Sequence, residues 1–540
     1  MILKGQIVDI ISRKIFKGEL HIIDNKISKI IPNDSITETN YILPGLVDAH
    51  IHVESSMLIP SEFARLATAH GTVATVSDPH EIANVMGIEG VNFMIENGKQ
   101  VPFKFYFGAP SCVPATTFET SGASIDSQQI GDLLARDDIK YLSEMMNFPG
   151  VLFNDKEVWA KINAAKKYGK PIDGHAPGLK GEDAAKYVGA GITTDHECFT
   201  IEEAIDKIKS GMFVQIREGS AAKNYESLSS LIDSHPDFVM LCSDDKHPND
   251  LEKGHVNQVI KRALADGYDF MNILQACILN PVRHYKLDIG LLQVGNAADM
   301  ILVDNLNDFT ILKTFVDGKL VAENGKTLIE SISVKPINKF HVNEIKPEDL
   351  YISNTGNTIK VMQAMDGELI TNKIEYTPPK ESSGIISDTK ADVLKIMVLN
   401  RYQKSKPAIG FIQGFGFTRG AIASSVAHDS HNIVAIGITD EEMVKAVNLV
   451  NESEGGVSWV DGDRTAVLEL PVAGIMSHMD GYQVAEKYEQ LDQLAKSLGT
   501  KLNAPYMTLS FMALLVIPEL KLSDKGLFDG STFSLTTLEV

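Results

Sequence analysis

The sequence LPGLVDAHIHVESS, residues 43–56, gives the first clear indication of architecture. In it a short apolar run ends in polar residues, with His50 and His52 one residue apart. If this run is a strand, both imidazoles point to the same face with Cα atoms roughly 6.5 Å apart, close enough to share one ion. Imidazole is a common metal ligand, so the segment predicts a strand that leads into a metal site. Two inward histidines in a polar cavity are the alternative for this pair alone.

The same pattern repeats along the following residues. Apolar runs with polar ends alternate with helical patterns that close on glycine, such as TIEEAIDKIKSG at 200–211. The runs are TVATVSDPH (72–80), FKFYFGAPS (103–111), IKYLSEMMN (139–147), KPIDGHAP (170–177), ITTDHECF (192–199), MFVQIREGS (212–220) and FVMLCSDD (238–245). Eight strands alternating with helices predict an α/β fold, a (β/α)8 TIM-type barrel at residues 44–289. A doubly wound open sheet is the competing architecture, but no GxGxxG follows the first strand.

The flanking segments predict two further domains. Residues 1–43 and 290–335 both contain short apolar runs separated by tight turns. Neither is long enough to bury a core alone, so we expect them to pair into one small composite β-sandwich domain in which the barrel is inserted. Another strand–helix alternation at residues 346–540 predicts a C-terminal α/β or α+β domain.

Composition argues against nucleic-acid and membrane binding. The 540 residues include 50 Lys+Arg and 71 Asp+Glu, which gives a net charge of −21. Broad binding to nucleic acids or anionic membranes needs clustered Lys and Arg instead. Residues 1–20 lack the uninterrupted apolar region of a secretion signal, and the four cysteines lie far apart. We therefore expect free thiols and a cytoplasmic protein.

Possible metal ligands end the predicted barrel strands in succession. In chain order they are His50, His52, His80, Glu144, His175, His196, Glu218 and Asp244. Functional groups of such barrels lie at the carboxyl ends of the strands, so this series is expected to converge at one mouth. Imidazole and carboxylate groups suit divalent ions, and a carboxylate can bridge two of them. The whole series predicts a metal centre more strongly than any one pair does.

These motifs resemble the amidohydrolase superfamily of metal-dependent barrel hydrolases, through PGLVDAHIHVESS and the later His, His and Asp. Within it, the chain is similar to the bacterial adenine deaminase family. The motifs that carry this similarity are DPHEIANV (78–85), SEMMNFPGV (143–151), DGHAPGL (173–179), TTDHE (193–197), IREGSAA (216–222) and LCSDD (241–245). The resemblance covers essentially the whole chain. It implies hydrolytic deamination of adenine to hypoxanthine and ammonia, a reaction of purine salvage, at a centre of two divalent metal ions.

The resemblance also implies roles for individual residues. They are His50 and His52 for one ion, His175 and His196 for the other, Glu144 as the bridge, and Asp244 as a further ligand and the proton acceptor. Many superfamily members carry a carbamylated lysine at the bridging position, whereas Lys140 lies at the wrong end of this strand. Metal coordination can lower the pKa of a water molecule toward ~7. Mn and Fe are expected first, and Zn is also compatible.

Five more residues are candidates for substrate binding or for protonating the purine ring: His80, Glu81, Arg217, Glu218 and Ser220. A salt-bridged barrel rim is the alternative for each. Asp245 follows Asp244 directly, and adjacent strand residues face opposite ways, so we expect only one to face the ions. We choose Asp244, because it is the first carboxylate after the apolar strand.

The segment AHDSHN, residues 427–432, holds three possible ligands, His428, Asp429 and His431. It would either close the pocket or hold an extra ion, while a polar surface loop is the simpler expectation.

Two alternative functions remain open at this point. One is a cyclic-amide hydrolase of the dihydroorotase or hydantoinase type, against which the position of Glu144 argues. The other is a catalytically silent purine-binding scaffold, against which the complete ligand series argues. Adenine and water are the expected small-molecule partners, and a chain of this kind is expected to form a homodimer.

Overall fold

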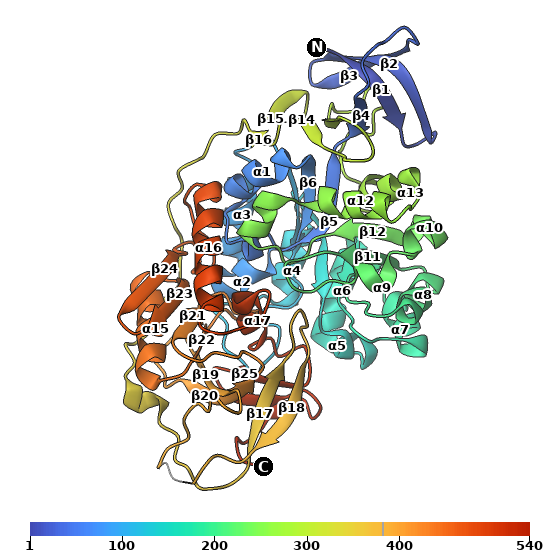
Figure 1. Cartoon of the computed structure of the whole chain (residues 1–540). Coiled ribbons are helices and arrows are strands. Elements are labelled where there is room, and N and C mark those ends of the chain that lie inside the picture. The colour runs from blue at the N-terminus through green and yellow to red at the C-terminus, as the bar shows by residue number, and fades with distance from the viewer. Residues whose placement is uncertain (381–382) are drawn as a thin grey trace.

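The computed structural model describes residues 1–380 and 383–540, and one end of the molecule is a β-sheet assembled from two distant segments (Figure 1). The strands of this sheet are β1 (Ile2–Asp9), β2 (Lys14–Ile23), β3 (Lys26–Pro32), β4 (Tyr41–Pro44), β13 (Met300–Val303), β14 (Ile311–Val316), β15 (Lys319–Glu323) and β16 (Lys326–Thr327). Their spatial order is β16-β15-β14-β13-β4-β1-β2-β3. Antiparallel pairing of β4 with β13 joins the two segments, with Ile42 opposite Leu302. Hydrogen bonding therefore makes the two segments one continuous sheet.

Eight parallel strands follow β4 and form the centre of the molecule. They are β5 (Leu46–Ile51), β6 (Thr72–Ser77), β7 (Lys104–Ala109), β8 (Ile139–Met145), β9 (Ile172–Gly174), β10 (Thr194–Asp195), β11 (Phe213–Arg217) and β12 (Val239–Cys242). Hydrogen bonds order them as two sheets, β5 to β9 and β10 to β12. The amide of Thr193 donates to the carbonyl of Ile172, and the amide of Asp244 donates to that of His50. The parallel sheet therefore curls until its last strand meets its first, as in a TIM-like barrel and unlike an open doubly wound sheet.

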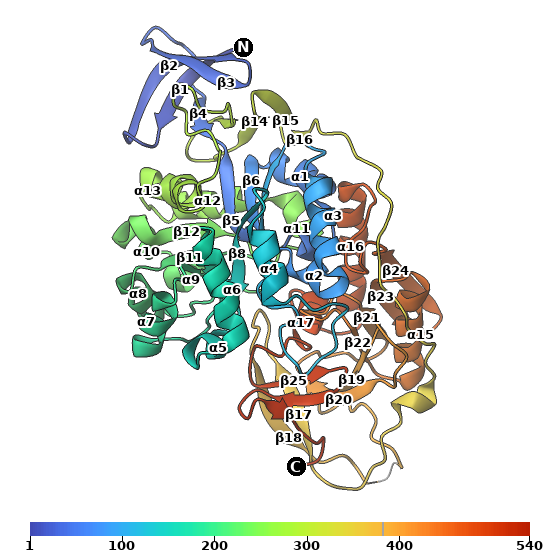
Figure 2. The same cartoon turned by 180° about the vertical axis from the view of Figure 1, so that it is seen from behind.

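Helices cover the outside of this curled sheet, as Figure 2 shows from behind. They are α1 (Pro60–Ala69), α2 (His80–Met86), α3 (Ile88–Gly98), α4 (Ser127–Leu134), α5 (Phe148–Leu152), α6 (Lys156–Lys167), α7 (Gly181–Gly189), α8 (Ile201–Lys209), α9 (Tyr225–Leu228), α10 (Leu231–Ser234), α11 (Pro248–Lys253), α12 (Val256–Ala265), α13 (Phe270–Leu274) and α14 (Asn280–His284). Helix α6 shows why the sequence folds this way. The Asp155 carboxylate caps its first turn, and Val158, Ile162 and Ala165 form its buried stripe.

The C-terminal region packs against the carboxyl ends of the barrel strands. Its mixed sheet contains β17 (Ile359–Ala364), β18 (Thr371–Tyr376), β19 (Val393–Leu399), β20 (Ala408–Gln413), β21 (Ala421–Ser424), β22 (Ile433–Gly437), β23 (Gly456–Asp461) and β24 (Arg464–Glu469). A smaller sheet contains β25 (Leu520–Ser523), β26 (Gly526–Asp529) and β27 (Ser534–Leu535), and the main helices are α15 (Asp440–Glu452), α16 (Gly481–Lys496) and α17 (Pro505–Phe511). Helix α16 packs on α11 of the barrel. Both views place α16 and α17 beside the barrel (Figures 1 and 2). Buried apolar residues of the two regions consequently form one core.

Two smaller findings complete the description. All four cysteines are buried free thiols. Among the described residues, no helix combines the length and the apolar character that crossing a bilayer requires.

Candidate metal centre and substrate pocket

Six predicted ligands converge at the carboxyl ends of the barrel strands. They are His50, His52, Glu144, His175, His196 and Asp244. Each side chain comes from within, or within two residues of, the end of β5, β8, β9, β10 or β12. None is more than 7% exposed, so the cluster is shielded from bulk water.

Glu144 lies between two groups of imidazoles. Its Oε1 is 3.4 Å from Nε2 of His52, and its Oε2 is 2.9 Å from Nδ1 of His175 and 3.2 Å from Nε2 of His196. Burial alone would raise the pKa of Glu144, but the neighbouring His175 and His196 hold it well below its usual range. Glu144 thus directs one oxygen to each imidazole group, and such a donor set suits a divalent cation.

Asp244 faces the imidazoles with one oxygen and a guanidinium with the other. Its Oδ1 is 3.3 Å from Nε2 of His50 and 3.2 Å from Nε2 of His52. Nη1 of Arg217 donates to its Oδ2 at 2.6 Å. Burial raises the pKa of Asp244, yet His196 and Arg217 outweigh burial and hold it well below its usual range. The neighbouring cationic groups therefore favour the ionised form of this carboxylate.

Several buried ring nitrogens of this cluster have no hydrogen-bond partner in residues 1–380 and 383–540. They are Nδ1 of His50, Nε2 of His175 and Nδ1 of His196. Buried polar atoms are nearly always paired, so these nitrogens call for a cation or a ligand. In addition, Nδ1 of His52 lies 3.2 Å from the carbonyl oxygen of Asp78. If Nδ1 donates there, Nε2 keeps a lone pair for an ion, so the donor set fits divalent cations.

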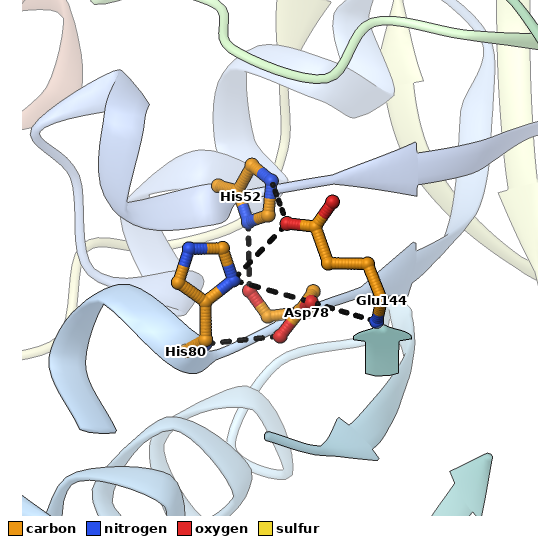
Figure 3. Close-up of side chains that lie close together, drawn as sticks. All are labelled: His52, Asp78, His80 and Glu144. Atoms are coloured by element: carbon orange, nitrogen blue, oxygen red, sulfur yellow. Dashed lines mark hydrogen bonds and ion pairs between the residues drawn. The ribbon is translucent and has the colours of Figure 1, made fainter. Parts of the chain in front are cut away.

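Asp78 and His80 extend the cluster beyond the six predicted ligands (Figure 3). Nδ1 of His80 lies 3.2 Å from Oδ2 of Asp78 and 3.3 Å from Oε1 of Glu144. Together with His52, these residues form a group compact enough to hold a metal ion. His80, predicted for substrate binding, therefore lies against Glu144. The sequence analysis missed Asp78, although it directly follows Ser77, the last residue of β6.

Asp244 and Asp245 both line the pocket, but only Asp244 contacts the imidazoles of His50 and His52. Strand β12 ends at Cys242, and Asp244 has a φ of 58°, so strand alternation no longer applies at these residues. Asp245 accepts a hydrogen bond from the hydroxyl of Ser55 and lies near His428. Asp244 nevertheless contacts the imidazoles, while Asp245 faces the outer part of the pocket.

The substrate-binding candidates after β11 divide into two groups. Arg217 ends this strand and lines the pocket, as predicted. The prediction for Glu218 and Ser220 is wrong, because the chain turns outward after Arg217. Oε2 of Glu218 is 3.4 Å from Nη1 of Arg262, and the hydroxyl of Ser220 donates to Asp250 at 2.6 Å. Glu218 thus forms the salt-bridged rim that was its alternative interpretation.

Glu197 is a pocket residue that the sequence analysis missed. It lines the cavity directly after His196, and Arg217 donates to both of its carboxylate oxygens. The available signal was its position beside a predicted ligand in TTDHE.

The segment AHDSHN reaches the barrel mouth from the C-terminal region. Nδ1 of His428 contacts Oε1 of Glu81, and Nε2 of His431 is 2.5 Å from Oε2 of the same carboxylate. The amide of Ala427 donates to Nδ1 of His431, so His431 donates to Glu81 through Nε2. Oδ1 of Asp429 lies 3.6 Å from Nε2 of His80. The expectation of a polar surface loop is therefore wrong, because these side chains are buried at the pocket.

The rest of the outer wall is apolar. Met146 comes from the barrel, whereas Leu369, Phe511 and Leu514 come from the C-terminal region. The rings of Phe511 and His428 lie 5.4 Å apart between centroids, with planes inclined by 33°. The pocket thus has a charged floor and a mainly apolar cover, which suits a small planar molecule with polar edges.

Comparison with known proteins agrees with this geometry. The amidohydrolase family matches residues 41–321, and the adenine deaminase C-terminal domain matches residues 368–534. An adenine deaminase of Sulfurovum sp. (strain NBC37-1) is 53% identical over 534 residues, which cover 99% of this chain and 98% of that protein. An adenine deaminase of Methanosarcina barkeri is 52% identical, with 99% and 98% covered, and one of Salinibacter ruber is 51% identical, with 98% and 97% covered. With a buried imidazole and carboxylate cluster at the mouth of its curled parallel sheet, this chain belongs to the adenine deaminase family of amidohydrolases.

Proposed function

We propose that this protein hydrolyses adenine to hypoxanthine and ammonia. The observation that carries the proposal is the position of Glu144, which directs one oxygen toward His52 and the other toward His175 and His196 on the floor of a covered pocket. The family membership supports adenine as the substrate. A cyclic-amide hydrolase would be expected to carry a lysine at this bridging position instead of Glu144.

The ligands proposed for two divalent ions are His50 and His52 for one, His175 and His196 for the other, with Glu144 between them and Asp244 alongside. Imidazole and carboxylate donors suit Mn or Fe first, and Zn is also compatible. Such ions, when bound, supply Lewis-acid chemistry that makes water nucleophilic near neutral pH.

Asp244 is the proposed proton carrier of the reaction. Its Oδ2 is held by Arg217, which leaves Oδ1 directed at the imidazole cluster. As a general base Asp244 takes a proton from the attacking water, and as a general acid it returns a proton to the departing amine. Asp245, bonded to Ser55, faces away from this position and has no part in the transfer.

The pocket walls orient the purine and exclude water. Phe511 and Leu514 face the charged floor from the C-terminal side, so a planar base can lie between them and the reacting groups. Exclusion of bulk water strengthens each electrostatic interaction on the floor of the pocket. Glu81, His428 and Asp429 are the polar groups proposed to contact the edge of the base.

The finer division of the chain follows the sequence-based limits. We propose a barrel at residues 44–289, a small β domain formed as one continuous sheet by residues 1–43 and 290–335, and a C-terminal domain at residues 346–540. The amidohydrolase match ends at residue 321, within the second segment of this β domain, and the adenine deaminase C-terminal match begins at residue 368.

A direct assay tests the function. Metal-depleted protein is reloaded separately with Mn, Fe or Zn and incubated with adenine, adenosine, dihydroorotate and hydantoin, and hypoxanthine and ammonia are measured. Stoichiometric hypoxanthine and ammonia from adenine, with little turnover of adenosine, is the expected result. Turnover of dihydroorotate or hydantoin without any of adenine would identify a cyclic-amide hydrolase. Adenine binding without turnover under all three metals would identify a silent scaffold.

A further inference from the structure

A fully buried lysine lies directly behind the apolar wall of the pocket. Lys521 belongs to β25 and is 0% exposed. Its Nζ donates to the carbonyl oxygen of Leu369 at 2.6 Å and to that of Phe511 at 3.0 Å. Both acceptor residues line the pocket with their side chains. Leu369 and Phe511 therefore lie between the buried amine and the substrate space.

Lys521 has no charged partner to offset its burial. Burial lowers the pKa of Lys521 to about 7, and no carboxylate among the described residues raises it again. By contrast, the buried Lys395 donates to Asp440 at 2.6 Å and to the carbonyl oxygen of Leu350 at 2.9 Å. Lysine is seldom fully buried without an ionic partner, because an ammonium group loses its hydration there. The two carbonyl contacts are therefore the feature of this site that needs an explanation.

The two carbonyl groups belong to segments that are far apart in the sequence. Leu369 lies in the connection between β17 and β18, and Phe511 is the last residue of α17. Strand β25 touches both segments on either side of Lys521. The amide of Leu522 donates to the carbonyl of Met512 at 3.0 Å, and the hydroxyl of Thr371 donates to the carbonyl of Leu520 at 2.8 Å. Lys521 thus sits where the two wall segments meet, with one hydrogen bond to each.

We propose that Lys521 is a positioning residue for the substrate, which fixes Leu369 and Phe511 at the separation that a flat heteroaromatic base requires. The lysine does not reach the reacting atoms, and it acts through the backbone of these two residues. A neutral amine keeps two N–H donors, so both hydrogen bonds persist whether or not the group is protonated. The proposal rests on the proposed function for the identity of the base.

The test compares two buried lysines of the C-terminal region. Lys521→Met keeps the length and apolar character of the side chain but leaves both carbonyl groups without a donor, and Lys521→Gln restores part of the donor capacity. Lys395→Met is the matched control, because it removes a buried lysine whose hydrogen-bond partners, Leu350 and Asp440, do not line the pocket. Kinetic constants for adenine, metal content and melting temperature are measured for each protein.

For Lys521→Met we expect KM for adenine to rise about tenfold with a smaller change in kcat, since two buried hydrogen bonds are lost. Metal content should stay at the wild-type level, and Lys521→Gln should recover part of the change in KM. Lys395→Met should lower the melting temperature without altering KM. A folded, metal-loaded Lys521→Met protein with KM within twofold of wild type would overturn the proposal. So would an equal rise of KM in Lys395→Met, because the effect would then be general destabilisation.

Two provisions keep the outcomes separate. If Lys521→Met does not fold, the same KM criterion is applied to Lys521→Leu, which also lacks a donor. If the wild-type protein itself fails to deaminate adenine, the proposed function is wrong. Equilibrium binding of adenine to metal-loaded wild type and variants then still tests whether Lys521 shapes the pocket.

Discussion

The two sides of the pocket differ in chemistry and in origin. The barrel side contributes imidazoles, carboxylates and Arg217, which project from the ends of parallel strands. The C-terminal side contributes Leu369, Phe511 and Leu514, together with the histidines that hold Glu81. The reacting groups thus depend on a rigid, closed sheet, while the shape of the substrate space depends on segments brought together by long-range contacts.

This difference predicts two kinetic classes of variant. Changes on the barrel side should lower kcat or metal content, because they remove groups that act on the reacting atoms or hold the ions. Changes on the C-terminal side should raise KM and leave metal content intact.

The largest effect is expected for Asp244→Asn, which keeps the size of the side chain and removes its charge and its proton acceptor. General acid–base groups contribute roughly 10²–10⁴-fold, so kcat should fall by at least that range at saturating adenine. Asp245→Asn is the neighbouring control, and its effect should be confined to KM or stability. If Asp244→Asn stays active while Asp245→Asn loses activity, the proton acceptor is Asp245 and not Asp244.

Sequence reasoning located the barrel side of this comparison well. Each of His50, Glu144, His175 and Asp244 ends or follows an apolar run, and a barrel brings the ends of its strands to one mouth. Local pattern and fold topology together were therefore sufficient to bring these residues together. Asp78 was not predicted, because the DPH motif was interpreted through His80 as a substrate-binding segment.

The C-terminal side could not be predicted in the same way. Neither Lys521 nor Phe511 belongs to a recognisable motif. Phe511 lines the pocket and Lys521 donates to its carbonyl, yet both residues lie hundreds of positions from the barrel motifs. The histidines of AHDSHN were predicted as possible ligands, but their burial depends on how the whole C-terminal region packs onto the barrel. Glu218 and Ser220 were misplaced because a turn after a strand can direct its side chains outward, which strand periodicity does not reveal.

The next largest effect is expected for Glu144→Gln. An amide is neutral and keeps only one acceptor oxygen of the carboxylate it replaces, so the link between the two imidazole groups is weakened. Metal occupancy should fall together with the rate, by about 10–100-fold in metal affinity. Element analysis of the purified variant and titration of metal-free protein measure both quantities. Full metal occupancy with an unchanged rate would show that Glu144 does not join the two groups.

A smaller effect is expected when His428 and His431 are both replaced by Ala. The Glu81 carboxylate then remains buried without its two partners, which is costly and displaces it from the edge of the pocket. KM for adenine should rise about tenfold while metal content is unchanged. His341→Ala, at an exposed histidine of the segment that precedes the C-terminal domain, is the control. A loss of one metal equivalent would instead identify the segment as the holder of an extra ion, and unchanged kinetics and metal content would leave it as scaffold.

The last prediction concerns the pH dependence of stability, and it probes the C-terminal side without any substrate. The pKa of Lys521 is about 7 in the folded protein and roughly 10.4 in an unfolded chain. Between these values the unfolded state binds more protons, so the free energy of unfolding should rise with pH, by up to about 1.4 kcal/mol per pH unit. Lys521→Met lacks this contribution, and wild type should therefore gain stability relative to it from pH 7 to pH 9. Denaturant midpoints of both proteins across this range measure the difference, with Lys395→Met as a control whose ammonium group is paired with Asp440. If the difference in stability between wild type and Lys521→Met does not change with pH, Lys521 keeps an ordinary pKa. The lysine behind the pocket wall would then be hydrated in the folded protein.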